Sequence, residues 1–100
     1  MSKYRLSKKA IIDLKNIWDY TYDKWSVYQS DIYYHMLIES FDKVSKNPKS
    51  GKKYSMIIDD LKGYKAGRHI IFYRETKEGL IEILRILHEQ MDLKKRMKEK

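Results

Sequence analysis

The chain of 100 residues contains no cysteine, one proline and four glycines. Without cysteine it can form no disulfide, no iron–sulfur cluster, no cysteine-ligated zinc site and no thiol nucleophile. Its few glycines form neither a phosphate-binding loop nor a nucleophile elbow. Apolar runs are short, so we expect no membrane span. No apolar stretch follows the first five residues as it would in a signal peptide, so we expect a cytoplasmic protein.

Candidate metal ligands are equally sparse. The three histidines, His35, His69 and His88, show no spacing typical of a zinc site. Asp59 and Asp60 are adjacent in a polar segment, where neighbouring carboxylates normally point apart, and we interpret them as turn residues. We therefore expect no metal ion and no cofactor, and we expect His35 to be a surface residue.

Charge is unevenly distributed along the chain. Basic residues outnumber acidic residues by 22 to 14. Five lysines and no acidic residue lie between Lys43 and Lys53, and residues 94–100 contain five basic residues and one acidic residue. The remainder is nearly neutral. We interpret the chain as a single domain at 1–93 followed by a basic tail at 94–100, and we expect the basic excess to attract an acidic partner.

The first half of the chain has helical periodicity. After a short alternating segment at 4–7, apolar residues recur every three or four positions, which predicts a helix over about 8–24 with Ser7 as its N-cap. Ser26 and Gln29 fit a capping box for a second helix that runs to about Ser45. A link of two or three residues between two amphipathic helices predicts an antiparallel helical hairpin. Pro48 ends the second helix.

The second half reads as strands. Residues 68–74 and 80–87 are rich in β-branched, aromatic and other apolar side chains, which predicts two strands with a turn at Gly79. Residues 61–66 form a weaker strand candidate that ends at a turn at Gly67. Residues 80–87 are apolar at both parities, which indicates a strand that is covered on both faces or lies centrally in the sheet. Strict alternation groups Leu87 with Ile81 and Ile83. A short polar helix is expected from Met91. The order β-α-α-β-β-β-α predicts an α+β fold: a small antiparallel sheet with the N-terminal helical hairpin packed on one face.

One constellation could carry chemistry. Arginines, histidines and a tyrosine fall on neighbouring predicted strands, and metal-free RNA cleavage needs such acids, bases and cations: Arg68, His69, Tyr73, Arg74, Arg85 and His88. Strand alternation weakens this interpretation, because it places Arg85 and His88 on opposite faces. The alternative is that Arg74 and Arg85 pair with carboxylates such as Glu75 or Glu82. Helix aromatics such as Trp18, Tyr22, Trp25 and Tyr33 are expected mainly in the core.

The chain resembles the ParE toxins of the RelE/ParE superfamily. The resemblance runs in order from residue 4 to residue 92, and its most specific part is the C-terminal motif. It rests on the segments Tyr4-Arg5-Leu6-Ser7, Trp25-x-x-x-Gln29-x-x-x-Tyr33, Asn47-Pro48-x-x-Gly51, Gly67-Arg68-His69-Ile70-Ile71-Phe72-Tyr73-Arg74 and Ile83-Leu84-Arg85-Ile86-Leu87-His88-x-x-Met91-Asp92.

The resemblance implies the toxin of a type II toxin–antitoxin system, with roles in stress response and plasmid maintenance. Its expected partner is a ParD-like antitoxin, in a hetero-oligomer such as a heterotetramer, and its expected target is DNA gyrase. No sequence-specific nucleic-acid binding is expected of the toxin alone. Expected antitoxin-binding residues are Ile11, Leu14, Trp18, Tyr33 and Leu37; expected target-binding residues are Tyr73, Arg85, His88, Met91 and Asp92.

The alternative is a ribosome-dependent mRNA interferase of the RelE type, in which His88, Arg85 and Arg68 would be catalytic. Nucleases of this shape carry an arginine where this chain has Ile70, and His88 is followed by Glu89-Gln90 rather than by further basic residues. The nuclease set is therefore incomplete. The resemblance favours a non-enzymatic inhibitor of gyrase over an endoribonuclease.

Overall fold

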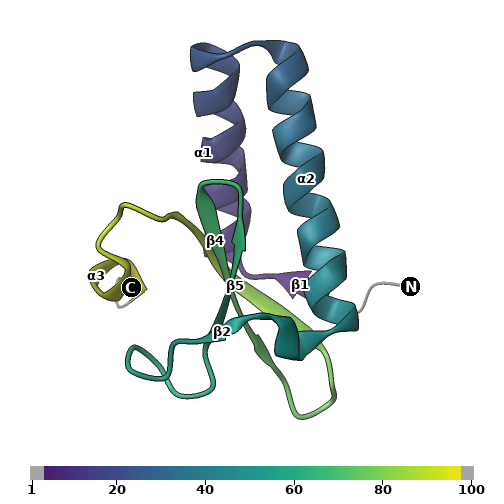
Figure 1. The fold of residues 1–100 in the computed structure, drawn as a ribbon, viewed down its shortest axis with the longest axis vertical. Coiled ribbons are helices and arrows are strands. Elements are labelled where there is room, and N and C mark those ends of the chain that lie inside the picture. Colours follow the sequence, from purple (N-terminus) through teal and green to yellow (C-terminus); the bar gives the residue numbers. More distant parts are fainter. Residues whose placement is uncertain (1–3, 98–100) are drawn as a thin grey trace.

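The computed structural model describes residues 4–97 and shows a helical hairpin beside a mixed sheet (Figure 1). The elements are β1 (Tyr4–Leu6), α1 (Lys8–Lys24), α2 (Val27–Lys46), the 3-10 turn η1 (Pro48–Ser50), β2 (Lys52–Lys53), β3 (Lys62–Ala66), β4 (His69–Glu75), β5 (Ile81–His88) and α3 (Leu93–Met97). The predicted α+β class and element order are confirmed. The structure adds β2, and α3 takes in residues 94–97 of the predicted basic tail.

The sheet has the strand order β1-β5-β4-β3-β2. Neighbouring strands are antiparallel except for β1, which pairs in parallel with residues Ile81–Ile83 of β5. The sheet is therefore mixed rather than purely antiparallel. Hairpin turns at Gly67 and Gly79 occur as predicted, with φ values of +62° and +80° that glycine adopts without a Cβ clash.

Both predicted helix caps are confirmed. The Ser7 side chain accepts a hydrogen bond from the Ala10 amide at 3.0 Å, and the Ser26 side chain accepts one from the Gln29 amide at 3.1 Å. Each cap satisfies an amide that has no partner within its helix. The helices run antiparallel and extend beyond the end of the sheet (Figure 1). No helix within residues 4–97 is long and apolar enough to cross a membrane.

The sheet is covered on both faces, as the sequence of β5 predicted. On one face the two helices pack through a core that includes Ile17, Leu37, Phe41, Ile71 and Tyr73. A second cluster lies on the opposite face, because it contains the alternate strand residues. Its members are Leu61, Ile70, Phe72 and Leu87, covered by Tyr54, Ile57, Ile58, Leu84, Leu93 and Met97. Loop 54–60 and α3 therefore form the second cover.

A β-bulge interrupts β5 at Leu84. Phe72 of β4 is opposite Arg85, but the next residue, Tyr73, is opposite Ile83, so β5 contains one extra residue. Before the bulge Ile81 and Ile83 face the helices; after it Ile86 does so, and Leu87 joins the opposite cluster. Strict alternation grouped Leu87 with Ile81 and Ile83, and this prediction is wrong because the bulge exchanges the two faces.

Helix α1 covers the edge of β5 beyond the point where β1 ends. The Ser7 amide donates to the Ile83 carbonyl at 2.9 Å, and the Ser7 hydroxyl donates to the Leu84 carbonyl at 2.7 Å. The Asp13 carboxylate then accepts from the Ile86 amide at 3.0 Å. Ser7, the N-cap of α1, and Asp13 within α1 thus satisfy backbone groups of β5 that would otherwise form an open strand edge.

Candidate functional site

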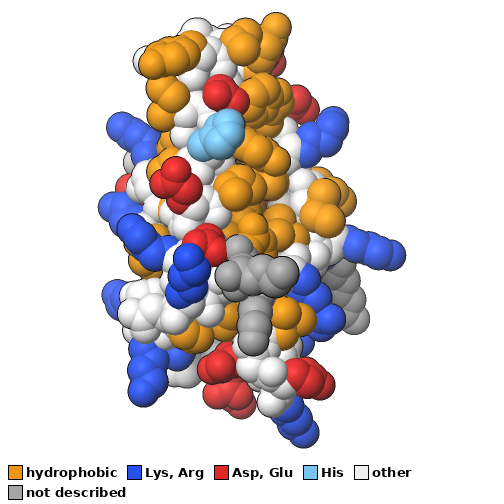
Figure 2. All heavy atoms as spheres, turned by 90° about the vertical axis from the view of Figure 1, so that its right-hand side faces the viewer, with side chains coloured by type: hydrophobic (Ala, Val, Ile, Leu, Met, Phe, Trp, Pro, Cys, Tyr) orange, Lys and Arg blue, Asp and Glu red, His pale blue; other side chains and the backbone are white. Residues whose placement is uncertain are grey.

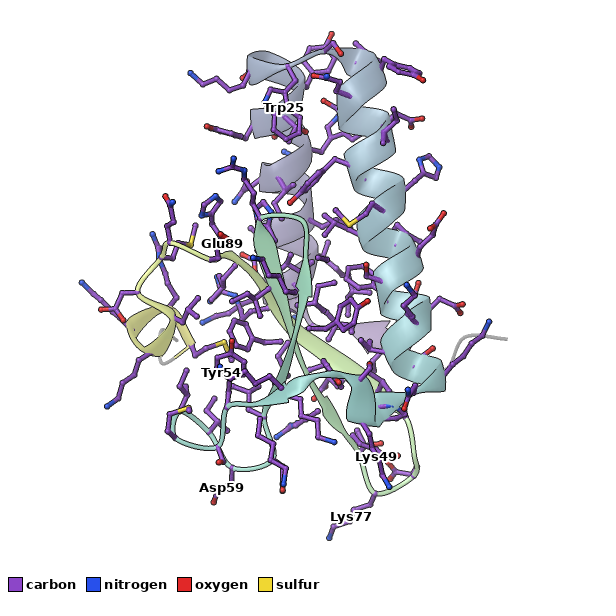
Figure 3. The ribbon with its side chains drawn as sticks, viewed as in Figure 1. Trp25, Lys49, Tyr54, Asp59, Lys77 and Glu89 are labelled. Carbon is purple, nitrogen blue, oxygen red and sulfur yellow. The ribbon has the colours of Figure 1, made fainter. Side chains whose placement is uncertain are left out.

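A cavity of about 600 Å³ lies where α1, the end of β5 and the chain leading to α3 meet; we call it the C-terminal cavity. Its walls combine apolar side chains with titratable ones. The lining residues are Ile12, Asp13, Asn16, Ile17, Tyr20, His69, Arg85, Ile86, Leu87, His88, Met91 and Arg96. Figure 3 shows the chain after β5, where Glu89 is labelled, turning away from α1 toward α3.

One wall of the cavity is an ion pair between Arg85 of β5 and Asp13 of α1. The Arg85 Nε and Nη2 atoms donate to the two Asp13 oxygens at 2.8 and 3.0 Å. The two side chains are only 13% and 11% exposed, so solvent screens the pair weakly. The remaining Nη1 atom donates to the carbonyl of Arg96 at 3.0 Å, so one guanidinium joins α1, β5 and α3.

A histidine pair forms the adjoining part of the wall. The His69 and His88 rings face one another in an edge arrangement with centroids 5.3 Å apart. Burial first, and then the neighbouring His88, lower the pKa of His69 from 6.5 to about 4. His69 is therefore neutral near pH 7. The Gln90 amide donates to Nδ1 of His88 at 3.1 Å, which leaves the Nε2 atom of that ring for a proton.

Tyr33 fixes His69 from the side of α2. Its hydroxyl lies 2.6 Å from Nδ1 of His69 and accepts a hydrogen bond from the Arg68 amide at 3.1 Å. Burial raises the pKa of Tyr33, so its hydroxyl keeps its proton and can donate it to the neutral imidazole. This arrangement orients the His69 ring and ties α2 to the β3–β4 turn.

Arg85 and His88 both line the C-terminal cavity. They follow the bulge and lie in a regularly paired stretch, so the alternation that places them on opposite faces still applies between them. The cavity takes in both because residues 85–88, of both parities, line it. The predicted pairing of Arg74 is confirmed, since its Nε lies 3.1 Å from Glu82 across the strands. Arg85 also pairs with a carboxylate, but its partner Asp13 lies on a helix rather than on a neighbouring strand.

Four of the five residues expected to face a target lie around the C-terminal cavity or beside it. Arg85, His88 and Met91 line it, and Asp92 follows Met91, where it accepts from the Lys95 amide at 3.1 Å and caps α3. Tyr73 does not belong with them. It is fully buried, and its hydroxyl donates to the Pro48 carbonyl at 2.7 Å, so it anchors η1 instead.

The residues expected to bind the antitoxin also divide into surface residues and one that is buried. Ile11 is exposed, and Leu14, Trp18 and Tyr33 are partly buried. Leu37 is completely buried against the sheet and cannot contact a partner. The periodicity that identified Leu37 marks the side of α2 that packs on the sheet, and this side is the core rather than a partner surface.

Most of the exposed large apolar side chains lie toward the tip of the hairpin, a location that the sequence prediction missed. A groove of about 450 Å³ is lined by Trp25, Gln29, Ile32, Tyr33 and Met36; we call it the hairpin groove. Trp25 and Tyr22 were expected in the core, but both are half-exposed because the helices extend past the sheet (Figure 3). Figure 2 shows hydrophobic side chains gathered over this upper part of the molecule.

The hairpin tip carries apolar residues outside the core stripe. Val27, Tyr28 and Ile32 are all more than half exposed, and Tyr28 reaches 75%. Single exposed apolar residues are ordinary, but a contiguous apolar patch on a small protein marks an interaction surface. The signal in the sequence was the excess of apolar residues around the junction of the two helices, on faces that the core does not use.

Comparisons with known proteins agree on one family. The family described as the ParE toxin of type II toxin–antitoxin systems, parDE, matches residues 4–93. The chain is 40% identical over 92 residues to Toxin ParE1 of Mycobacterium tuberculosis and 32% identical over 92 residues to Toxin ParE1 of Caulobacter vibrioides. Each match covers 92% of this chain and 94% of the relative.

Two solved structures share the fold. The chromosomal ParDE system of P. aeruginosa superposes with a TM-score of 0.74 at 18% identity, covering 88% of this chain and 96% of that chain. The toxin–antitoxin complex RelBE2 of Mycobacterium tuberculosis gives a TM-score of 0.65 at 20% identity, covering 88% of this chain and 98% of that chain.

Proposed function

This chain belongs to the family of ParE toxins of type II toxin–antitoxin systems, and from that membership we propose that it inhibits DNA gyrase and is neutralised by a ParD-like antitoxin. Inhibition would be exerted by binding, with the residues around the C-terminal cavity facing gyrase. The observation that carries the choice between gyrase inhibition and RNA cleavage is the position of Arg85.

Metal-free RNA cleavage needs a cation at the scissile phosphate. Arg85, the arginine nearest to His88 in the sequence, directs two guanidinium nitrogens at Asp13 and the third at the Arg96 carbonyl. Its charge is balanced by a partly buried carboxylate, so the pair adds no net positive charge for a phosphate. Ile70, at the position where RelE-type nucleases carry arginine, points into the second apolar cluster. Both observations support a binding inhibitor rather than a nuclease.

Two assays test the target. Purified gyrase should lose supercoiling activity when this protein is added, and mRNA in a translation extract should stay intact. A Met91→Asp variant should relieve the inhibition, because Met91 is an exposed apolar residue at the cavity rim. Met56→Asp is the matched control, since Met56 is also exposed but lies on the 54–60 loop. Ribosome-dependent mRNA cleavage with unaffected supercoiling would overturn the proposal.

The hairpin groove supports the proposed antitoxin contact. Its apolar lining suits the apolar side of a segment that folds on binding, and the basic excess of the chain suits an acidic segment of the partner. We expect Ile32→Asp to weaken binding of a ParD-like antitoxin about tenfold or more, because it places a charge in an apolar contact. Titration calorimetry measures the affinity of the antitoxin for each protein. Equal affinity for the unmodified protein and for Ile32→Asp would exclude the groove as the contact.

A further inference from the structure

Helix α3 depends on contacts with the rest of the fold. It has five residues, and so short a helix does not persist in water without tertiary contacts. Leu93 and Met97 pack on the second apolar cluster, and Asp92 caps the N-terminal end. At its other end, the Arg96 carbonyl accepts a hydrogen bond from Arg85. The orientation of α3 therefore depends on where Arg85 is held.

Asp13 determines where Arg85 is held. Its two oxygens bind two guanidinium nitrogens and also receive the Ile86 amide, so the carboxylate fixes both the side chain and the bulged backbone of β5. A guanidinium is a rigid planar fork, so fixing two of its nitrogens also fixes the direction of the third. The third nitrogen points at α3.

We propose that Asp13 and Arg85 are positioning residues for toxicity, because they hold the C-terminal segment (residues 88–97) in the shape that contacts the target. The inference rests on the proposed function in that it places the target-facing surface on this segment. It adds a role for α1: a helix otherwise used for core packing and the partner surface also sets the geometry of the toxic surface. Asp13, Arg85 and Arg96 all line the C-terminal cavity, so the contacts that join α1 to α3 run along its wall.

The test replaces the planar guanidinium of Arg85 by the ammonium group of lysine, which keeps the positive charge. In Arg85→Lys an ammonium can still pair with Asp13, but it cannot reach the Arg96 carbonyl with a second fixed donor. Arg74→Lys is the matched control, because Arg74 also forms an arginine–carboxylate pair, with Glu82, at the opposite end of β4 and β5. The measurements are growth arrest on induction, the thermal unfolding midpoint, and the rate of tryptic cleavage after Lys94 and Lys95 followed by mass spectrometry.

We expect Arg85→Lys to be cut within α3 about tenfold faster than the unmodified protein, as loss of one charged hydrogen bond allows. Growth arrest should need a correspondingly higher level of the protein, with the unfolding midpoint little changed. Arg74→Lys should match the unmodified protein in all three measurements. Full growth arrest by Arg85→Lys with a rapidly cleaved α3 would overturn the proposal, because a released segment would still be toxic.

A second variant covers the case in which Arg85→Lys does not fold. Leu93→Ala weakens the packing of α3 and leaves the ion pair intact, so it should show the same faster cleavage and the same loss of growth arrest. If it stays fully toxic with α3 released, the proposal is wrong. Growth arrest reports toxicity whatever the target is. If the protein arrests growth but leaves gyrase active, the proposed target is wrong. The test of Asp13 and Arg85 as positioning residues still gives a clear answer in that case.

Discussion

At the scale of single residues, the hydrogen-bonded group of Arg68, Tyr33 and His69 requires a neutral imidazole. Tyr33 accepts from the Arg68 amide and lies 2.6 Å from Nδ1 of His69, so a proton on that nitrogen would remove its acceptor. Burial, the nearby His88 and the weaker opposing effects of Asp13 and Glu89 leave the pKa of His69 at about 4. This lowered pKa makes stability depend on pH.

We expect the protein to lose stability as the pH falls from about 6.5 to about 4. The unfolded chain binds a proton at His69 with a pKa of about 6.5, whereas the folded chain resists protonation until about pH 4. The unfolded state therefore gains protons first, and the loss should reach about 1–3 kcal/mol at the acidic end. Urea unfolding across this range measures it.

The control for this prediction is the exposed His35 on α2, which interacts with Asp31 one turn away. His35→Gln should keep the full decline in stability between the two pH values. His69→Gln should reduce the decline in stability, since the imidazole that resists protonation in the folded state is absent from this variant. A decline that is identical in both variants would assign the pH dependence to other groups.

The sequence predicted some residue roles and missed others for a physical reason. Ser7 and Ser26 were identified as caps because a cap acts within three residues of its own position. The role of Asp13 was not predicted, because helical spacing is local and gives no information about a partner 72 residues away. Tyr73 and Leu37 were assigned to binding surfaces, yet both are buried by elements distant in sequence.

At the scale of elements, β5 shows what a pattern of alternation cannot reveal. Its length, position and burial on both faces followed from its apolar residues. The bulge at Leu84 did not, because a bulge is a property of the pairing between two strands. It decides which of Arg85, Ile86 and Leu87 meets α1, because it reverses the facing of the residues after it relative to those before it.

Ser7 joins two elements, and we expect Ser7→Ala to cost more stability than Ser26→Ala. The Ser7 side chain caps α1 and also donates to the Leu84 carbonyl at 2.7 Å, whereas Ser26 caps α2 in an exposed position. Losing the cap alone costs about 1 kcal/mol, and losing the second, partly buried bond adds about 1 kcal/mol. Denaturant unfolding of the two variants gives the difference directly; equal costs would mean that the bond to β5 contributes nothing.

At the scale of the whole molecule, the order of helices and strands was predictable from the sequence, but the pairing of the two edge strands of the sheet was not. Helical and strand periodicities are local, and they gave the α+β order. The parallel pairing of β1 with β5 joins residues at the two ends of the chain, and β2 has only two residues, too few to form a pattern. The projecting hairpin also follows from the whole fold, because the sheet is too short to cover both helices along their length.

We expect the isolated protein to self-associate through the hairpin tip. Tyr28 and Ile32 are exposed apolar residues on α2 near the hairpin groove, and such a patch aggregates when no partner covers it. A double variant with Tyr28→Lys and Ile32→Lys should remain monomeric at concentrations where the unmodified protein does not. Light scattering after size-exclusion chromatography measures this.

Met56→Lys serves as the comparison for self-association. Met56 is 71% exposed, but it stands on the 54–60 loop and not on the hairpin. It should leave the self-association unchanged. A monomeric unmodified protein at high concentration would contradict the expectation.

The parallel pairing of β1 with β5 also sets the timing of folding during synthesis. Tyr4 pairs with Ile81, so the first strand waits for 77 more residues before its neighbour exists. At roughly 5–20 residues per second this interval lasts roughly 4–15 s. Once Lys46 has been made, the chain contains both helices of the hairpin but not the completed sheet. An antitoxin already present in the cell can meet those helices before the C-terminal segment, where we propose the target-facing surface, has been made.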